Sequence, residues 1–353
     1  MKKTLLFVLS IFFLVSCGTD KKNAMTWRGV EVHESSKDTI IIEPTISEWR
    51  DNYPQVVCFT WDDTTPGHEE VAELFNRYNL KTTFFIVSTQ YNNWAKRRFF
   101  HRQRMKFFDY KTVIEEGHEV GSHTAHHCNL INASLDSVYN ECLLSSSQIY
   151  ERFGYYPTTL SHPTSHYNEA IDSIIHLHYL DSRYSTAKDF DSTISFMHIR
   201  TEYNFPYYKA SLDSFAISNK KQYIYGGHEL DGWGYEPIAS NTLDSLLSYL
   251  TGKYLNQFWI TTFENLTMYK YLYDNVSIIN EKGETIINLD KVKQIMERFT
   301  HPDAVITLCY PNINLDVSSP GLVNYWFEGG NTYVNIDLRK NNVLYICRAH
   351  YCK

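Results

Sequence analysis

A strand–helix–strand unit near the start of the folded region constrains this chain most. The apolar run Val56–Trp61 has the pattern of a buried strand, and Thr82–Ser88 has the same pattern. Between them, His68–Leu80 carries apolar residues at helical spacing, namely Val71, Leu74, Phe75 and Tyr78. A helix that connects two strands in this order makes them parallel, so the unit predicts a parallel sheet or a β/α barrel.

The alternation of strands and helices continues along the chain and stops near Asp274. We therefore expect an α/β region over residues 51–274. From Val276 the pattern changes to a hairpin and several short strands, which indicates a small β-rich C-terminal domain over residues 275–353.

Residues 1–17 have the pattern of a targeting segment rather than of a folded element. Lys2 and Lys3 precede an apolar run, Leu5–Val15, that is too short to span a bilayer. The run leads to Cys17 in a stretch that resembles a bacterial lipobox, where cleavage leaves a lipid-modified cysteine. We expect a lipoprotein signal peptide, a tether over residues 18–50, and a membrane-anchored protein of the cell envelope outside the cytoplasm. The alternative is an ordinary secretory signal with a chance cysteine.

The net charge of the chain bears on which macromolecules it can bind. A net charge of −7 argues against a general nucleic-acid-binding protein. The basic, aromatic stretch at 90–108 is an exception in this acidic chain. We expect this stretch either to contact an anionic glycan or lipid headgroups, or to be simply a solvated loop or helix.

Two histidines four residues apart, His123 and His127, are the first candidates for a metal site. One turn of helix at that spacing would place both rings on one face, where they can bind one ion. A third ligand is then needed, and Asp62 or Asp63, after the first strand, is the best candidate. The alternative is that the two histidines only cap a turn.

This set of residues indicates a reaction class. Zinc held by two imidazoles and a carboxylate keeps an open position, where water ionises near a pKa of about 7. A second carboxylate can accept the proton of that water, and a facing histidine can protonate a leaving group. Asp62, Asp63 and His228 follow apolar strands, and catalytic side chains of a β/α barrel collect at such strand ends. We therefore predict metal-assisted hydrolysis of an acyl bond, with Zn²⁺ or another divalent transition metal as cofactor.

Three stretches resemble the polysaccharide deacetylases, the NodB-homology family of carbohydrate esterases. Thr60–Asp63 is similar to the T-F-D-D motif, His123–His127 to the H-[S/T]-x-x-H motif, and residues 225–229 to the G-H of a bacterial subgroup. The resemblance spans residues 55–273 and implies a distorted β/α barrel with a groove across the strand ends.

The same resemblance implies a role for each residue of the site. Asp62 would be the base and Asp63 a metal ligand, an order that the spacing alone leaves open. His123 and His127 would be the other two ligands, and His228 the general acid.

The chain departs from the family pattern at several positions. Thr64 stands where the family usually has glycine. The third motif, usually R-x-P-[Y/F], is Ser161–Thr164 here, so its arginine is missing. We expect Arg183, at a later strand end, to replace that arginine by pairing with Asp62. The backbone N–H of Thr164 would help to hold the oxyanion.

The predicted function is a membrane-tethered deacetylase that removes acetyl groups from N-acetylated sugars of a polysaccharide or peptidoglycan. Trp233 and Tyr235, after His228, either stack on a sugar ring or pack in the core. One alternative is an O-acetyl polysaccharide esterase. The other is a non-catalytic glycan-binding lipoprotein on the same scaffold.

Overall fold

The computed structural model describes residues 43–90, 110–165, 168–184, 194–200, 202–231, 235–281 and 284–348. The predicted signal peptide with Cys17, most of the tether, nearly all of the basic stretch and Trp233 lie outside these ranges. Among the described residues, no helix combines the length and the apolar character needed to cross a bilayer.

Parallel strands form the larger sheet, in the order β6-β5-β4-β3-β2-β8-β7, with β9 paired to β2. The strands are β2 (Gln55–Trp61), β3 (Thr83–Ile86), β4 (Glu119–Ser122), β5 (Thr159–Ser161), β6 (Asp181–Arg183), β7 (Ile194–His198), β8 (Gln222–Gly227) and β9 (Phe258–Thr261). Each of their pairings is parallel, so the prediction from the strand–helix–strand unit is confirmed.

The sheet is an open, distorted barrel. On one edge, β2 pairs with β8 from Val56 to Trp61. On its other edge, β9 pairs with the first half of β2 and β3 with Thr60 and Trp61, so the sheet forks there. Within the described part of the chain β6 and β7 do not pair, and the curled sheet therefore stays open between them. The distorted barrel that the family resemblance implied is confirmed.

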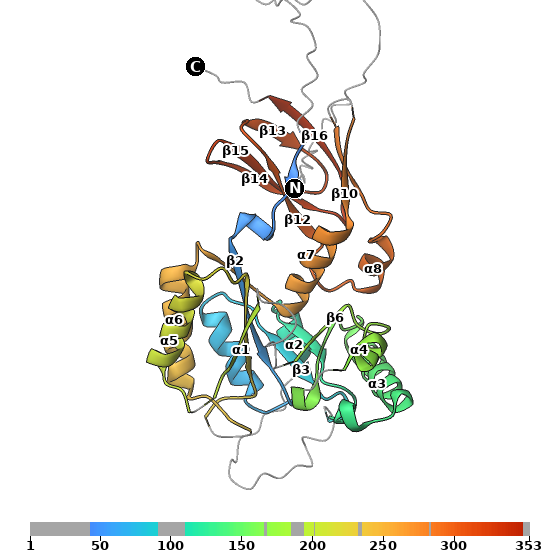
Figure 1. Ribbon diagram of the computed structural model, residues 1–353, viewed down its shortest axis with the longest axis vertical. Helices are drawn as coiled ribbons and strands as arrows, with labels where there is room; N and C mark the ends of the chain where they lie inside the picture. Colours follow the sequence, from blue (N-terminus) through green and yellow to red (C-terminus); the bar gives the residue numbers. More distant parts are fainter. Residues whose placement is uncertain are drawn as a thin grey trace, which may run out of the picture. The chain divides into compact units, whose positions relative to one another are not determined.

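Helices follow the strands, and all but the last cover the outer face of the sheet. The last helix packs against Val56 and Cys58, on the opposite face. The helices are α1 (His68–Arg77), α2 (Tyr110–Glu115), α3 (Leu135–Phe153), α4 (Glu169–Ile175), α5 (Phe205–Ala216), α6 (Ser240–Tyr254) and α7 (Phe263–Asn275). Figure 1 shows α1, α5 and α6 on one side of β2. Their apolar stripes meet the strand in one core, in which Phe59, Phe75, Leu212 and Leu246 are fully buried or nearly so.

Antiparallel strands form the β-rich C-terminal region, as predicted. They are β10 (Ser277–Glu281), β11 (Glu284–Asn288), β12 (Val305–Tyr310), β13 (Leu315–Ser318), β14 (Leu322–Glu328), β15 (Asn331–Asp337) and β16 (Val343–Arg348), with the short helix α8 (Lys293–Arg298). They build the sheets β1-β12-β15-β14 and β10-β11-β16-β13. The first sheet includes β1 (Thr45–Ile46) from before the barrel.

One stretch of the barrel carries elements that periodicity did not reveal. Residues 189–218 have mixed signals in the sequence, yet they contain β7 and α5. β7 is only partly buried along its length, so its residues show no clean apolar run. The start of α5 is set by local chemistry instead, because the Asn204 side chain accepts from the Tyr207 N–H.

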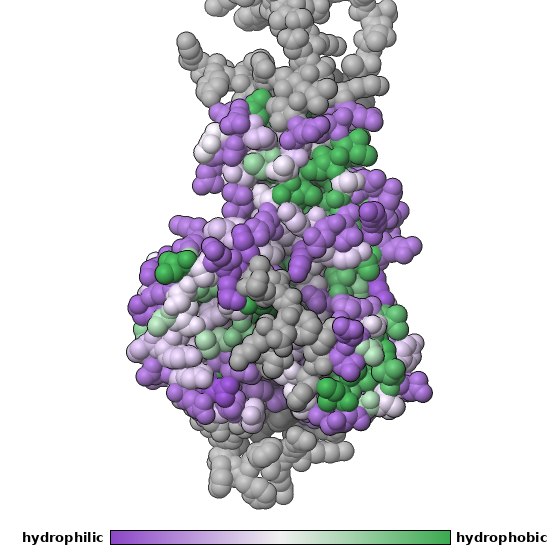
Figure 2. All heavy atoms as spheres, in the orientation of Figure 1, coloured by the Kyte–Doolittle hydropathy of each residue, from purple (hydrophilic) through white to green (hydrophobic). Residues whose placement is uncertain are grey.

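The surface of the described region carries both polar and apolar side chains. Figure 2 shows hydrophobic side chains gathered over α3, where Leu135, Leu143 and Leu144 are exposed. Exposed apolar side chains are common on protein surfaces.

Candidate metal and active site

The predicted site residues lie together because each follows the carboxyl end of a parallel strand. Asp62 and Asp63 follow β2, His123 follows β4, and His228 follows β8, while Arg183 ends β6. In a parallel sheet these ends share one edge, which is where β/α folds place their functional groups.

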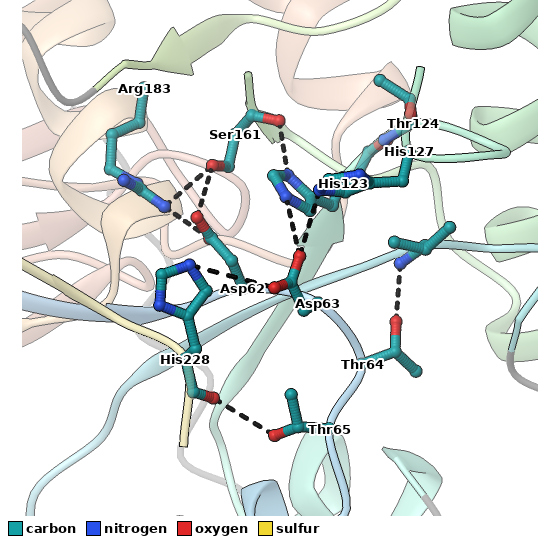
Figure 3. Close-up of polar contacts among 12 residues, drawn as sticks. Asp62, Asp63, Thr64, Thr65, His123, Thr124, His127, Ser161, Arg183 and His228 are labelled. Atoms are coloured by element: carbon teal, nitrogen blue, oxygen red, sulfur yellow. Dashed lines mark hydrogen bonds and ion pairs between the residues drawn. The ribbon is translucent and has the colours of Figure 1, made fainter. Parts of the chain in front are cut away.

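Three of these side chains form a compact cluster of metal-type ligands. Asp63 Oδ1 lies 3.4 Å from His123 Nε2 and 3.1 Å from His127 Nε2. The three ligand atoms lie within 4.8 Å of one another. Figure 3 shows both imidazole rings turned toward the Asp63 carboxylate.

The predicted helical turn between His123 and His127 is wrong. The segment after β4 is a loop, in which Thr124 and His127 have φ values of 66° and 59°. These left-handed residues reverse the chain and bring the two rings to a centroid distance of 4.9 Å. The histidines therefore converge through the loop rather than through helical periodicity.

The donor set fits a divalent transition metal. His123 Nδ1 donates to the Ser161 carbonyl at 2.8 Å, which leaves its Nε2 as an acceptor on the Asp63 side. His123 is buried, Asp63 half-buried and His127 exposed, so the cluster opens to solvent on one side. Two imidazoles and one carboxylate with an open side are the ligand pattern of catalytic zinc sites.

Asp62 is held apart from this cluster by a second set of contacts. Arg183 Nη2 donates to Asp62 Oδ1 and, at 2.8 Å, to Ser161 Oγ, which itself donates to Asp62 Oδ2 at 3.1 Å. Figure 3 shows this triangle beside Asp63. Burial alone would raise the pKa of Asp62, but the nearby Arg183 and imidazole groups outweigh it and lower the pKa.

The expected pairing of Arg183 with Asp62 is thus made from the neighbouring strand β6. Ser161 and Arg183 are register partners on β5 and β6, so the small serine leaves room for the guanidinium. Arg183 is 4% exposed and lies between the rings of Phe85 and Phe196, at 5.3 and 5.4 Å from their centroids. This packing holds the guanidinium in position against Asp62.

Thr64, which replaces the usual glycine, adopts a left-handed conformation with φ 56°. A β-branched residue is strained there. Its hydroxyl accepts a hydrogen bond from the Val87 N–H at 2.7 Å, which compensates part of the strain. The Thr64 hydroxyl thus links the turn after β2 to the chain that follows β3.

His228 faces the carboxylates from the opposite side. Its Nε2 lies 3.9 Å from Asp63 Oδ2, and its buried Nδ1 has no hydrogen-bond partner among the described residues. Burial lowers the pKa of His228, against the opposing effect of Asp62 and Asp63. The Thr65 hydroxyl donates to the His228 carbonyl at 3.2 Å (Figure 3).

The remaining candidate residues lie around the metal cluster and are not part of it. Thr164 follows β5 within the short 3₁₀ turn Pro163–Ser165 and has φ 64°. Tyr235 is 64% exposed, and its ring meets that of His228 edge-on at 5.1 Å. His126 turns away from the cluster toward Glu141, with its Nδ1 2.7 Å from Oε1.

The sequence reasoning missed two polar residues at this edge. In the sequence Ser161 is only a departure from a motif, because its contacts with Asp62, His123 and Arg183 depend on strand register. His68, the first residue of α1, is fully buried beneath Asp62 and His228. A polar residue at a helix start ordinarily indicates a cap, so no sequence signal pointed to this burial.

The part of the chain that carries most of this site is similar to known proteins. Residues 50–181 match the family model described as polysaccharide deacetylase. The chain is 31% identical over 123 residues to the peptidoglycan-N-acetylglucosamine deacetylase PgdA of Listeria monocytogenes, which is 33% of this chain and 22% of that protein. It is 28% identical over 122 residues to the peptidoglycan-N-acetylglucosamine deacetylase of Bacillus cereus, which is 34% of this chain and 51% of that protein.

Among solved structures, the chain is similar to the Xyl-CE4 domain of a multidomain xylanase from the hindgut metagenome of Trinervitermes trinervoides. The TM-score is 0.42 at 19% identity, over 60% of this chain and 89% of that one. The chain thus spans about half or less of the length of the two named relatives. The matched family segment contains Asp62, Asp63, His123 and His127 but ends before Arg183 and His228. The similarity to the polysaccharide deacetylase family is thus found over residues 50–181 of the chain.

Proposed function

We propose that this protein is a metal-dependent hydrolase that removes acetyl groups from N-acetylated sugars of a polysaccharide or peptidoglycan. One observation carries the proposal. Asp63, His123 and His127 converge at one strand-end edge, with the Arg183-bound Asp62 beside them and His228 facing them. The named relatives, which are peptidoglycan-N-acetylglucosamine deacetylases, support the choice of substrate class.

Asp63, His123 and His127 would hold the metal, which we propose to be Zn²⁺ or another divalent transition metal. When bound, such an ion supplies Lewis acidity toward the acetyl carbonyl and the attacking water. The hydrogen bond from His123 Nδ1 to the Ser161 carbonyl fixes the ring orientation and the tautomer that this role requires.

Two groups of the chain would move protons. Asp62, kept ionised by Arg183, would accept the proton of the attacking water. His228, on the other side of Asp63, would protonate the leaving amine of the sugar. The backbone N–H of Thr164 would donate to the oxyanion, a contribution of about 2.7–4 kcal/mol for one such donor.

Tyr235 favours a glycan as the substrate. It is an exposed aromatic ring next to the proposed acid, where it can stack on a sugar. We place Trp233 in the same role from the sequence alone. An O-acetyl esterase would use the same groups, because an ester oxygen is an easier leaving group than an amine.

The deciding experiment measures bound metal and released acetate with the same purified protein. Acetylated chito-oligosaccharides, peptidoglycan and acetylated xylan are the substrates, and Asp62→Asn is the variant. We expect acetate release from the first two, a loss of about 100-fold or more in Asp62→Asn, and retained metal in both proteins. Chelation should stop the release, and added Zn²⁺ should restore it.

Other outcomes select the alternatives. Release from xylan alone would identify an O-acetyl esterase. Metal binding without release from any of the three substrates would favour the glycan-binding protein.

We also propose that Cys17 is lipid-modified and anchors the protein in the cell envelope. The apolar run and the lipobox-like stretch before Cys17 support this proposal. Palmitate labelling in a bacterial host should mark the wild type, and Cys17→Ser should lose both the label and the membrane association. A labelled Cys17→Ser protein would refute the assignment.

A further inference from the structure

The strand ladder beneath the active site ends at one hydrogen bond, and two buried carbonyls lie just beyond it. β2 and β8 pair up to Trp61 and Gly227, and the Asp62 N–H donates to the Gly227 carbonyl at 2.9 Å. The next carbonyls after the two strands are those of Asp62 and His228, and they no longer face strand partners. Buried carbonyls of this kind need donors from elsewhere.

A single imidazole serves both carbonyls. His68 Nε2 lies 3.0 Å from the Asp62 carbonyl oxygen and 3.0 Å from that of His228. Because carbonyl oxygens only accept, the proton must be on Nε2, where one N–H is shared by two acceptors. The Tyr110 hydroxyl then donates to Nδ1 at 2.8 Å, which satisfies the other ring nitrogen.

The ring has little freedom to move. His68 is fully buried, and it packs against Phe84 at a centroid distance of 4.9 Å and edge-on against Tyr110. The imidazole is thus a rigid bridge between the ends of β2 and β8. These ends carry the proposed base and the proposed acid, and Asp63 follows Asp62 directly.

The two carbonyls depend on His68 to different degrees. The His228 carbonyl also accepts from the Thr65 hydroxyl at 3.2 Å. Among the described residues, His68 is the one side chain with a hydrogen bond to the Asp62 carbonyl. Loss of the imidazole donor should therefore loosen the Asp62–Asp63 turn more than the His228 loop.

We propose that His68 is a positioning residue that sets the distance between two segments. One is the Asp62–Asp63 turn, which carries the proposed base and a metal ligand, and the other is the loop that carries the proposed acid, His228. The inference rests on the proposed function for its catalytic part. Its structural part, the placement of Asp63 for a metal, stands independently of any substrate.

The test compares two variants of similar size. His68→Gln keeps an N–H donor at nearly the same reach, whereas His68→Leu fills the space without a donor. Leu250→Ala, a core change on α6 outside this network, is the control for general loss of stability. Three quantities are measured at a temperature where all variants are folded: the affinity for Co²⁺ from its visible absorption, and kcat and KM for acetate release. The melting temperature of each variant is measured separately.

We expect His68→Leu to weaken Co²⁺ binding and to lower kcat by about 10-fold to 100-fold, as outer-sphere partners of metal sites typically do. KM should change little, because no substrate contact is removed. His68→Gln should recover most of the Co²⁺ affinity and of kcat, and Leu250→Ala should lower the melting temperature alone.

Wild-type Co²⁺ affinity in His68→Leu would overturn the inference, as would equal losses in His68→Gln and His68→Leu. If the wild type releases no acetate from any substrate, the proposed function fails, and the Co²⁺ titration still decides the role of His68.

Discussion

At the scale of single residues, one guanidinium holds the candidate base in place. Arg183 is buried between two phenylalanine rings and contacts both Asp62 and Ser161. A carboxylate whose ionised form has such a partner is a better-placed base than an unpaired buried one.

We predict that Arg183→Ala lowers kcat for acetate release by roughly 10-fold to 100-fold, because Asp62 loses its orientation. Arg183→Lys should restore part of this loss, since it keeps the charge but donates from one nitrogen. Steady-state kinetics with the metal content measured in parallel checks the result. Wild-type turnover in Arg183→Ala would show that Asp62 needs no such partner.

Thr64 offers a test of backbone strain at the same turn. Both Thr64→Gly and Thr64→Ala lose the hydrogen bond to the Val87 N–H, but only glycine tolerates the φ of 56° without strain. We predict that Thr64→Gly is more stable than Thr64→Ala by about 1 kcal/mol, the reverse of the usual order. Chemical denaturation of the two variants measures the difference, and an equal or greater stability of the alanine variant would contradict it.

At the scale of elements, the amino ends of the strands hold a buried acidic cluster, at the end opposite the metal site. Glu119 opens β4, and its carboxylate accepts from Thr83, Thr159 and the Glu264 N–H. The other carboxylate, that of Glu264 in α7, lies 2.6 Å from His301 Nδ1. Burial, helped by the nearby Glu264, raises the pKa of Glu119 to about 8.

The sign of the resulting pH dependence follows from proton linkage. A raised folded-state pKa means that native Glu119 keeps a proton that the unfolded chain releases above its own pKa. Stability should therefore fall as the pH rises toward 8. His301 acts in the same direction: burial opposes its charge, Glu264 outweighs that effect, and its pKa is raised.

We predict that Glu119→Gln, which mimics the protonated acid, reduces this slope. The free energy of unfolding should fall between pH 6 and pH 8 in both proteins. The fall should be smaller in the variant, by on the order of 1–2 kcal/mol. Denaturant titrations at both values measure it, with Glu297→Gln on the surface of α8 as the control. Parallel slopes in the wild type and Glu119→Gln would show that Glu119 is ionised in the native protein.

At the scale of the whole molecule, side chains on both sides of the predicted domain boundary near residue 275 pack together. Met268 and Leu272 of α7 are fully buried in the same cluster as Ile306, Val334 and Leu344 of the C-terminal sheets. β1 pairs with β12 although the two strands are more than 250 residues apart in the chain. The barrel and the C-terminal region therefore share a core.

We predict that a chain ending at Asp274 is destabilised. Two buried side chains of α7 become exposed, at about 1.5–3 kcal/mol each, which lowers the melting temperature by roughly 10 °C. A chain ending at Arg348 is the control and should melt like the full chain. An unchanged melting temperature in the shorter chain would show that α7 does not depend on the C-terminal sheets.

Residue pattern alone predicted the α/β class and the first strand–helix–strand unit, and it named Asp62, Asp63, His123, His127 and His228 as candidates that lie at one edge of the sheet. It succeeded because hydrophobic periodicity reports local burial and because parallel strands bring their carboxyl ends to one edge whatever their exact register. The placement of Arg183 against Asp62 also followed from this topology, although its role in turnover stays a prediction.

Only the tertiary structure decided which groups meet across that edge. The loop that joins His123 to His127, the Ser161–Arg183 register and the burial of His68 depend on contacts between distant segments. No local pattern encodes such contacts, because a polar residue has the same sequence signature whether water or a buried carbonyl is its partner.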